Sequence, residues 1–218
     1  MGRLEGKVAL ISGGARGQGA AEARAFVKEG AKVVFGDIID KNGYEVEGEI
    51  NKTSEASKYI HLDVTNEADW VSAINTTVTT FGKLNVLVNN AAIVIPRVPI
   101  EQRTVDEWER VQAVNSKGVF LGAKHAIPEM RRAGGGSIIN ICSVAGFGQS
   151  TTQEPAYAAS KGAVRVLSKV IATQHAKDKI RSNAIFPGQI DTEMVHQAMS
   201  DPKILAERLS RVPLGRLG

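Results

Sequence analysis

Residues 8–22 read VALISGGARGQGAAE, and this stretch decides the class of the fold. The apolar run Val8–Ile11 predicts a short strand, and the glycines between Gly13 and Gly19 predict a tight turn. Helical periodicity begins directly after the turn, near Gln18. A strand that runs through a tight turn into a helix is half of a β-α-β unit, so the stretch predicts an α/β protein.

The same pattern continues along the rest of the chain. Five further short runs are rich in β-branched and apolar residues, and we expect each to be a strand buried on both faces. These runs are Val33–Gly36, Tyr59–Leu62, Val86–Val88, Ser137–Ile141 and Arg181–Phe186. Segments of helical period lie between them. The expected helices lie near Gln18–Glu29, Asn42–Asn51, Asn66–Phe81, Thr104–Arg132 and Tyr157–Lys177.

Two local signals mark the ends of the longest expected helix. Thr104, with Glu107 three residues later, is a capping box, which starts a helix. The run Gly134-Gly135-Gly136 ends the helix, because residues without Cβ atoms have low helix propensity and reverse the chain easily. The alternation of strands and helices predicts one doubly wound Rossmann-type domain over residues 1–218, with a central parallel sheet.

Composition fits a folded domain and gives no sign of several partner classes. The chain has 218 residues, 43% of them apolar, and a net charge of +4. The charges form no basic stripe and no apolar run can span a bilayer, so we expect neither nucleic acid nor a membrane as partner. The one cysteine, Cys142, forms no internal disulfide, which fits a reducing, cytoplasmic setting. We expect no metal site, since no acidic or cysteine partner stands at ligand spacing from His61, His125, His175 or His196.

The glycine turn itself predicts a phosphate site. A turn without side chains at the N-terminus of a helix presents unpaired backbone N–H groups and the positive end of the helix dipole. This arrangement suits the pyrophosphate of a dinucleotide. The spacing Gly-x-x-x-Gly-x-Gly differs from the commonest fingerprint, however, and a purely structural turn would also use it.

Asp37 supports the dinucleotide interpretation. It ends the second expected strand, at the distance from the turn where a ribose-binding carboxylate is expected. A carboxylate accepts hydrogen bonds from ribose hydroxyls and repels a 2′-phosphate, so NAD is favoured over NADP. Arg16 is the contrary signal, because an arginine in the turn can pair with a 2′-phosphate.

Tyr157 and Lys161 are the strongest catalytic candidates. They stand four residues apart at the start of an expected helix, so their side chains share one face. A phenol with a pKa of about 10 is a weak base at neutral pH, and a neighbouring ammonium lowers that pKa by favouring the phenolate. Ser143 follows an expected strand at the edge of the sheet where ligands bind, and its hydroxyl can hold a substrate oxygen. Taken alone, Tyr-x-x-x-Lys is also common as an exposed pair.

Together these motifs resemble the short-chain dehydrogenase/reductase family over nearly the whole chain. The matching elements, in order, are Ser12 to Gly19, Asp37, Asp63-Val64, Asn89-Asn90-Ala91, Asn115, Ser143, Tyr157 to Lys161, and Pro187-Gly188 with Thr192. The resemblance implies a homo-oligomer, dimer or tetramer, that interconverts a secondary alcohol and a ketone with NAD. The implied catalytic residues are Asn115, Ser143, Tyr157 and Lys161. The implied cofactor contacts are Gly13, Arg16, Gly17, Gln18, Gly19, Asp37, Ile38, Asp63, Val64, Asn89, Ala91, Tyr157, Lys161, Pro187, Gly188, Ile190 and Thr192.

The same resemblance implies individual roles. Tyr157 carries the transferred proton, and Asn115 lies in a helix kink that supports a water chain from Lys161 to solvent. The remaining roles are adenine contacts for Asp63 and Val64, cleft walls for Asn89 and Ala91, and carboxamide contacts for Ile190 and Thr192.

Three features depart from the family pattern. Ala92 stands where family members have a glycine, and Ser12 replaces a threonine while keeping the hydroxyl. Family members continue beyond a segment like Pro213–Gly218 with another helix and a final strand. An open sheet edge is an aggregation hazard, so we expect the final strand to be missing from this chain and the natural chain to extend beyond Gly218.

Apolar segments are expected to wall the substrate pocket. They are Ala92–Pro96, Val144–Gly148, and the residues Met194, Val195 and Met199 within a lid over residues 188–212. An apolar wall with one polar focus suits a hydrophobic ring that carries a single oxygen, so we expect an alicyclic or steroid-like substrate. The N-terminal half also resembles bacterial hydroxysteroid dehydrogenases of this family, at Gly13–Gly17 and Phe35–Ile38.

Two alternative functions stay open at this point. Arg97 and Arg103 near the expected pocket mouth can receive an acidic carrier, which favours a 3-oxoacyl thioester reductase of the same family. A non-catalytic dinucleotide-binding scaffold would keep the glycine turn and Asp37, but it has no need of the catalytic residues. The sequence determines neither the natural substrate nor the preferred direction of the reaction.

Overall fold

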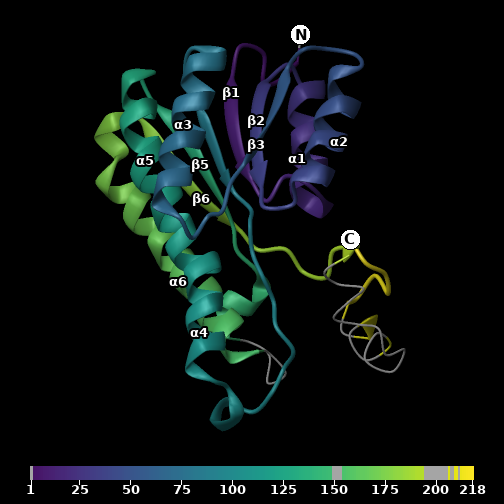
Figure 1. Cartoon of the computed structure of the whole chain (residues 1–218). Coiled ribbons are helices and arrows are strands. Elements are labelled where there is room, and N and C mark those ends of the chain that lie inside the picture. Colours follow the sequence, from purple (N-terminus) through teal and green to yellow (C-terminus); the bar gives the residue numbers. More distant parts are fainter. Residues whose placement is uncertain (1, 149–153, 194–205, 207–208, 211) are drawn as a thin grey trace.

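The strands form one parallel sheet in the order β3-β2-β1-β4-β5-β6 (Figure 1). The strand bounds are β1 Val8–Ser12, β2 Lys32–Asp37, β3 Ser57–His61, β4 Val86–Asn89, β5 Gly136–Ile141 and β6 Ile180–Ile185. The computed structural model describes residues 2–148, 154–193, 206, 209, 210 and 212–218. All the expected strands are present with small shifts at their ends, so the predicted doubly wound fold is confirmed.

Helices cover both faces of the sheet (Figure 1). One layer consists of α1 Gly17–Lys28 and α2 Asp40–Asn51, and the other contains α3 Glu67–Phe81, α5 Gly118–Arg132 and α6 Pro155–Gln174. Successive residues of β1 show the division: Ile11 packs in the core beneath α1, and Leu10 packs in the core beneath α3. No helix within the described residues is long and apolar enough to cross a membrane.

The two edge strands correct the expectation that every strand is buried on both faces. Lys58 in β3 and both Arg181 and Asn183 in β6 are exposed, whereas all residues of β1 and β4 are buried. The reason is position in the sheet: β1 and β4 have a strand on each side and helices above and below. β3 and β6 each have a strand on one side only in the described sheet.

The segment expected to be one helix over Thr104–Arg132 consists of three parts. α4 Val105–Gln112 begins with the predicted capping box of Thr104 and Glu107, a π-helical turn spans Ala113–Lys117, and α5 follows. A π-helical turn inserts one extra residue into the helix, and such turns often mark functional sites. Asn115 is buried within this turn, and α5 ends just before the glycine run, as expected.

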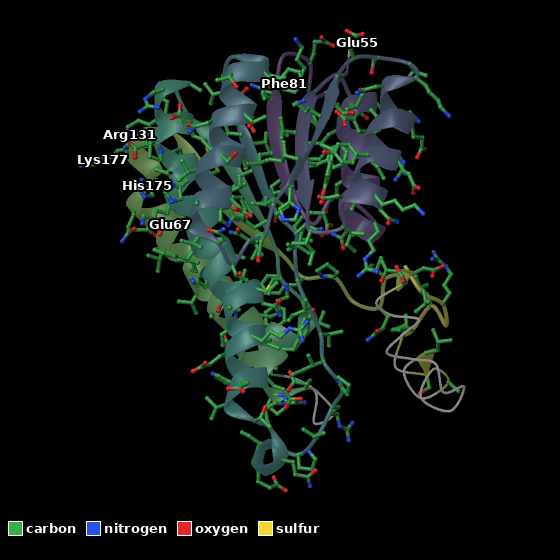
Figure 2. The ribbon with its side chains drawn as sticks, in the orientation of Figure 1. Glu55, Glu67, Phe81, Arg131, His175 and Lys177 are labelled. Carbon is green, nitrogen blue, oxygen red and sulfur yellow. The ribbon has the colours of Figure 1, made fainter. Side chains whose placement is uncertain are left out.

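α6 ends earlier than Lys177, the end expected from periodicity. The helix stops at Gln174, a 3-10 turn spans Ala176–Asp178, and Lys179 then turns the chain with a φ of 59°. Arg131 and His175 lie close together at these ends of α5 and α6 (Figure 2). Both contact Asp178, with Arg131 Nη2 at 2.7 Å and His175 Nδ1 at 2.9 Å, so the turn is fastened to α5.

Candidate active site

A cleft of about 290 Å³ opens at the carboxyl ends of the strands, beside the point between β1 and β4 where the strand order reverses. Most expected site residues line it: Gly13, Arg16, Gly17, Gln18, Asp37, Ile38, Asp63, Val64, Ala91, Ser143, Tyr157, Lys161, Pro187, Gly188, Ile190 and Thr192. Gly19, Asn89 and Asn115 were expected at the site and do not line the cleft. Across the described residues, no His, Cys, Asp and Glu side chains gather into a metal site.

The glycine turn leaves the N-terminus of α1 open toward the cleft. Gly13 donates a backbone hydrogen bond to Gly36 O at 2.8 Å, which holds the turn against β2. Gly17 begins α1 with a φ of 54°, and a Cβ atom built there would have Thr192 Cγ2 as its nearest neighbour, at 3.7 Å. Because Arg16 provides no side-chain cap, the first N–H groups of α1 suit an anionic ligand group.

Gly19 and Asn89 lie beneath the cleft, in close contact with other parts of the protein. A Cβ atom on Gly19 would lie 2.1 Å from Gly13 O, so the turn can close only around a glycine. Asn89 is 2% exposed and donates to Asn140 Oδ1 at 2.8 Å beneath the sheet edge. The next residue, Asn90, lines the cleft instead and donates to Gly13 O at 3.0 Å. Asn89 is the last residue of β4 and Asn90 follows it, and successive side chains of an extended segment point in opposite directions.

Asp37 is held at the end of β2 by backbone groups. Its Oδ2 accepts a hydrogen bond from Ala15 N at 3.1 Å, and its Oδ1 accepts one from Ile39 N at 3.2 Å. Nearby, Arg16 Nη1 lies 2.7 Å from Glu193 Oε2, and both residues line the cleft. Arg16 therefore already has a carboxylate partner, and Glu193 is a cleft residue that the motifs did not identify.

Ser143, Tyr157 and Lys161 meet where β5 ends and α6 begins. Ser143 and Tyr157 both line the cleft, and the Ser143 side chain lies close enough to act on the Tyr157 phenol. Lys161 is 2% exposed, and its Nζ donates to Ile141 O at 2.8 Å and lies 5.6 Å from the centre of the Tyr157 ring. The structure thus brings two hydroxyls and a buried amine to one point of the cleft.

The electrostatics of this group differ from the expectation. Burial raises the pKa of Tyr157, while the hydrogen bond with Ser143 acts in the opposite direction. Burial also lowers the pKa of Lys161 to about 8. In the protein alone, loss of solvation therefore outweighs the effect of Ser143, and the pKa of the phenol is raised.

Asn115 connects the loop after β4 to α6. Its Oδ1 accepts from Ile93 N at 2.8 Å, and its Nδ2 donates to Ile93 O at 2.9 Å and to Ser160 Oγ at 3.1 Å. Ser160 Oγ in turn donates to Tyr157 O at 2.7 Å. Each polar atom of the Asn115 side chain thus has a protein partner, and Asn115 is linked to the loop after β4 directly and to the Tyr157 backbone through Ser160.

The apolar wall is only partly as expected. Ala92 and Ile93 line the cleft together with Val114 and Ile141, whereas no residue of Val144–Gly148 lines it. Phe147 instead packs on Phe186, with ring centres 4.4 Å apart. Met194, Val195, Met199 and most of the lid expected over residues 188–212 lie outside the described residues.

Arg103 was expected at the pocket mouth, but its side chain is buried elsewhere. Its side chain is 4% exposed and forms ion pairs with Glu107 at 2.9 Å and with Glu154 at 3.1 Å. A guanidinium held between two carboxylates has no capacity to receive an acidic carrier. The sequence argument for an acidic substrate therefore loses one of its two residues.

Comparison with known proteins agrees with the fold and the cleft. A family model described as short chain dehydrogenase matches residues 7–203. The chain is 49% identical to a 3-alpha-(or 20-beta)-hydroxysteroid dehydrogenase of Mycobacterium tuberculosis over 200 residues, which cover 92% of this chain and 75% of the relative. It is 43% identical to a 2,5-dichloro-2,5-cyclohexadiene-1,4-diol dehydrogenase of Sphingobium indicum over 216 residues, 99% of this chain and 85% of the relative.

A solved structure gives the same result. The 3-ketoacyl-(acyl-carrier-protein) reductase of Brucella melitensis, complexed with NADH, superposes with a TM-score of 0.90 at 34% identity over 98% of this chain and 86% of that one. These relatives are enzymes, which favours an enzyme over a non-catalytic scaffold. The resemblance inferred from the motifs is confirmed, and the chain belongs to the short-chain dehydrogenase family.

Proposed function

We propose that this protein interconverts a secondary alcohol and a ketone with NAD, on a hydrophobic alicyclic or steroid-like substrate. The observation that carries the proposal is that Ser143, Tyr157 and Lys161 line one cleft whose nearby wall is apolar. Relatives named for a hydroxysteroid and for a cyclohexadiene diol support the substrate class.

The residues present fit a nicotinamide dinucleotide. The open N-terminus of α1 suits the pyrophosphate, the fixed carboxylate of Asp37 suits the ribose hydroxyls, and Asp63 and Val64 flank a place for the adenine. When bound, NAD supplies the hydride acceptor, and NADH the donor, for the substrate carbon. Ile190 and Thr192 line the same cleft, where they can hold the carboxamide.

The protein's own groups handle the proton. Ser143 Oγ holds the substrate oxygen, and Tyr157 Oη takes the hydroxyl proton in oxidation and returns it in reduction. Lys161, in its protonated form, favours the phenolate from its position next to the ring. The apolar residues around this point keep water away from the reacting oxygen.

Exposed apolar side chains and the buried cysteine are relevant to the oligomeric state and the cellular compartment. Phe120 on α5 and both Val166 and Val170 on α6 expose 42–60% of their surface. Apolar side chains of this kind on helices favour contact with a second copy, so we propose a homo-oligomer, either a dimer or a tetramer. A single buried cysteine fits the cytoplasm.

Preference for NAD over NADP is expected to depend on Asp37. Asp37→Ala removes the carboxylate that accepts from the ribose hydroxyls and repels a 2′-phosphate. The ratio of kcat/KM with NAD to kcat/KM with NADP is therefore expected to fall by about tenfold or more, which corresponds to about 1.4 kcal/mol. Adding Glu193→Gln removes the charge paired with Arg16 and is expected to narrow the ratio further. Steady-state kinetics with both cofactors measures these ratios.

The matched control for this experiment is Asp40→Ala. Asp40 is an exposed carboxylate close in sequence to Asp37, and it does not line the cleft. Its replacement is expected to leave the cofactor ratio unchanged. Equal or better efficiency of the wild type with NADP contradicts the assignment to NAD.

Substrate class is tested by comparing a hydroxysteroid, a cyclohexanol and a 3-hydroxyacyl thioester at matched NAD concentration. We expect kcat/KM for the better ring alcohol to exceed that for the thioester by about tenfold or more, because an apolar wall strongly disfavours a charged or polar chain. The solved structure of a 3-ketoacyl reductase favours the thioester as second candidate. If the wild type prefers the thioester and Arg97→Glu weakens that preference, the 3-oxoacyl thioester reductase replaces the ring-alcohol dehydrogenase as the proposed function.

A further inference from the structure

A buried ion pair lies at the start of the helix that carries Tyr157. The side chains of Arg103 and Glu154 are each 4% exposed, and Arg103 Nε lies 3.1 Å from Glu154 Oε1. The contact is an ion pair rather than a directed hydrogen bond. Burying two charges is unfavourable unless they are well paired, so such a pair outside the cleft needs an explanation. The proton transfer described above uses neither residue directly.

Glu154 holds the first turn of α6. Its Oε1 accepts a hydrogen bond from Ala156 N at 3.1 Å, and its Oε2 accepts one from Tyr157 N at 2.6 Å. Helices are usually capped by the shorter side chains of Ser, Thr, Asp or Asn. The longer glutamate satisfies both backbone N–H groups and still reaches Arg103. The backbone of Tyr157 is thus tied directly to one end of the ion pair.

Arg103 connects this turn to two other segments. Its Nη1 lies 2.9 Å from Glu107 Oε2, which belongs to the capping box of α4, and its Nη2 donates to Pro96 O. Pro96 follows the cleft-lining residues Ala92 and Ile93 in the loop after β4. One planar guanidinium therefore joins the loop, the start of α4 and the start of α6, which a single ammonium cannot do.

Other contacts fix the same turn from its far side. Gln112 Nε2 donates to Ala156 O at 3.0 Å, and Ser160 Oγ donates to Tyr157 O at 2.7 Å. Among the hydrogen bonds described, the backbone N–H of Tyr157 is held by Glu154. The placement of the Tyr157 backbone at its N–H side therefore depends on the carboxylate that Arg103 neutralises.

We propose that Arg103 and Glu154 are a positioning pair: Glu154 fixes the backbone that directs the Tyr157 phenol toward Ser143, and Arg103 neutralises the Glu154 carboxylate. This inference rests on the catalytic role proposed for Tyr157. Proton transfer demands close alignment of the reacting groups, and a displacement of about 1 Å lowers a rate by about 100-fold. The pair acts through Tyr157 and touches no substrate.

The pair also sets the charge at the start of α6. Lys161 on α6 and Cys142, directly after β5, are the titratable groups near the Tyr157 ring, and the Glu154 carboxylate lies at the backbone N–H of the same residue. Removing the guanidinium leaves an unpaired carboxylate, which disfavours the phenolate and moves the pH profile of oxidation upward. Removing the carboxylate has the opposite effect. Opposite shifts from the two partners are a signature that a purely structural contact does not give.

The experiment compares Arg103→Met, Glu154→Gln and the double variant with the wild type. Oxidation is followed with NAD and either cyclohexanol or the hydroxysteroid, whichever the wild type turns over faster. We expect each single variant to lose about 10- to 100-fold in kcat, with KM for NAD changed by less than about twofold. We expect the pH profile to move up in Arg103→Met, down in Glu154→Gln, and back toward the wild type in the double variant.

Two further variants make the result specific. Arg103→Lys keeps the charge without the three-way contact, so it is expected to keep the pH profile and lose part of kcat. Arg24→Met is the control, because Arg24 pairs with Glu49 between α1 and α2 in an exposed position, and its loss is expected to leave kcat unchanged. If Arg103→Met does not fold, Glu154→Gln and Arg103→Lys still test the loss of kcat, and Glu154→Gln still tests the downward shift of the pH profile.

The outcomes separate this inference from the function on which it rests. Wild-type kcat and pH profile in Glu154→Gln and both Arg103 variants would overturn the positioning pair, and so would pH profiles that all move in one direction. Tyr157→Phe is measured in parallel. If Tyr157→Phe retains turnover, the catalytic assignment fails. If Tyr157→Phe is inactive while the Arg103 and Glu154 variants behave as the wild type, only the positioning pair fails.

Discussion

Tyr157→Phe is expected to lower kcat by about 1,000-fold or more, which is within the range that general acid–base groups contribute. The substitution removes the transferable proton and almost no volume. The interaction of the hydroxyl with Ser143 is lost, yet the ring keeps its place next to Lys161. Binding of NAD, measured by calorimetry, is therefore expected to change by less than about twofold.

The control for this variant is Tyr44→Phe. Tyr44 is 61% exposed on α2, away from the cleft, so its hydroxyl is expected to have no effect on turnover. Substantial activity in Tyr157→Phe would contradict the mechanism. A parallel loss of NAD affinity would instead indicate that the phenol serves the cofactor rather than the proton.

The same residue predicts how the reaction responds to pH. Oxidation requires the phenolate, so its rate is expected to rise with pH through the apparent pKa of Tyr157, and the rate of reduction is expected to fall. Because burial raises this pKa in the protein alone, the positive nicotinamide ring of bound NAD is needed to bring it below about 10. Titration of the phenol by ultraviolet absorbance, with and without NAD, is expected to show a lower pKa with NAD.

Lys161→Met is expected to abolish most turnover and to stabilise the fold. Lys161 is 2% exposed, and burial lowers its pKa from 10.5 to about 8. Below pH 8 the full cost of charging the buried amine, about 3 kcal/mol, opposes folding. Between pH 8 and 10.5 the unfolded chain binds more protons, so stability of the wild type rises with pH in that window. Methionine has no charge and avoids this cost.

The size of the stability gain follows from two opposing effects. Loss of the hydrogen bond from Lys161 to Ile141 O offsets about 1 kcal/mol, which leaves a gain of about 2 kcal/mol at pH 7. For a chain of this length that corresponds to a Tm higher by about 4–8 °C. Lys169→Met on the exposed side of α6 is the control and is expected to change neither Tm nor kcat. A Tm of Lys161→Met below that of the wild type at pH 7 would contradict the argument.

Local sequence signals were sufficient for the fold. The strand, turn and helix of residues 8–22, the capping box at Thr104 and the glycines after Arg132 all appear where periodicity and backbone chemistry predicted them. These features depend on residues a few positions apart, so the sequence reports them directly. The convergence of Ser143 with Tyr157 and Lys161 could also be expected, because the carboxyl ends of parallel strands share one edge of the sheet.

Tertiary structure decided what depends on burial and on partners far along the chain. It placed Asn90 rather than Asn89 in the cleft, and it enclosed Arg103 in ion pairs. Glu154 caps α6, which the sequence did not predict. Its partner Arg103 lies 51 positions earlier in the sequence, so only the packed fold brings the two together. The direction of the Tyr157 pKa shift likewise follows from desolvation, which is the combined effect of packed neighbours. Residue types and their spacing determine which groups are available, but only the packed fold determines which of them are solvated, charged and aligned.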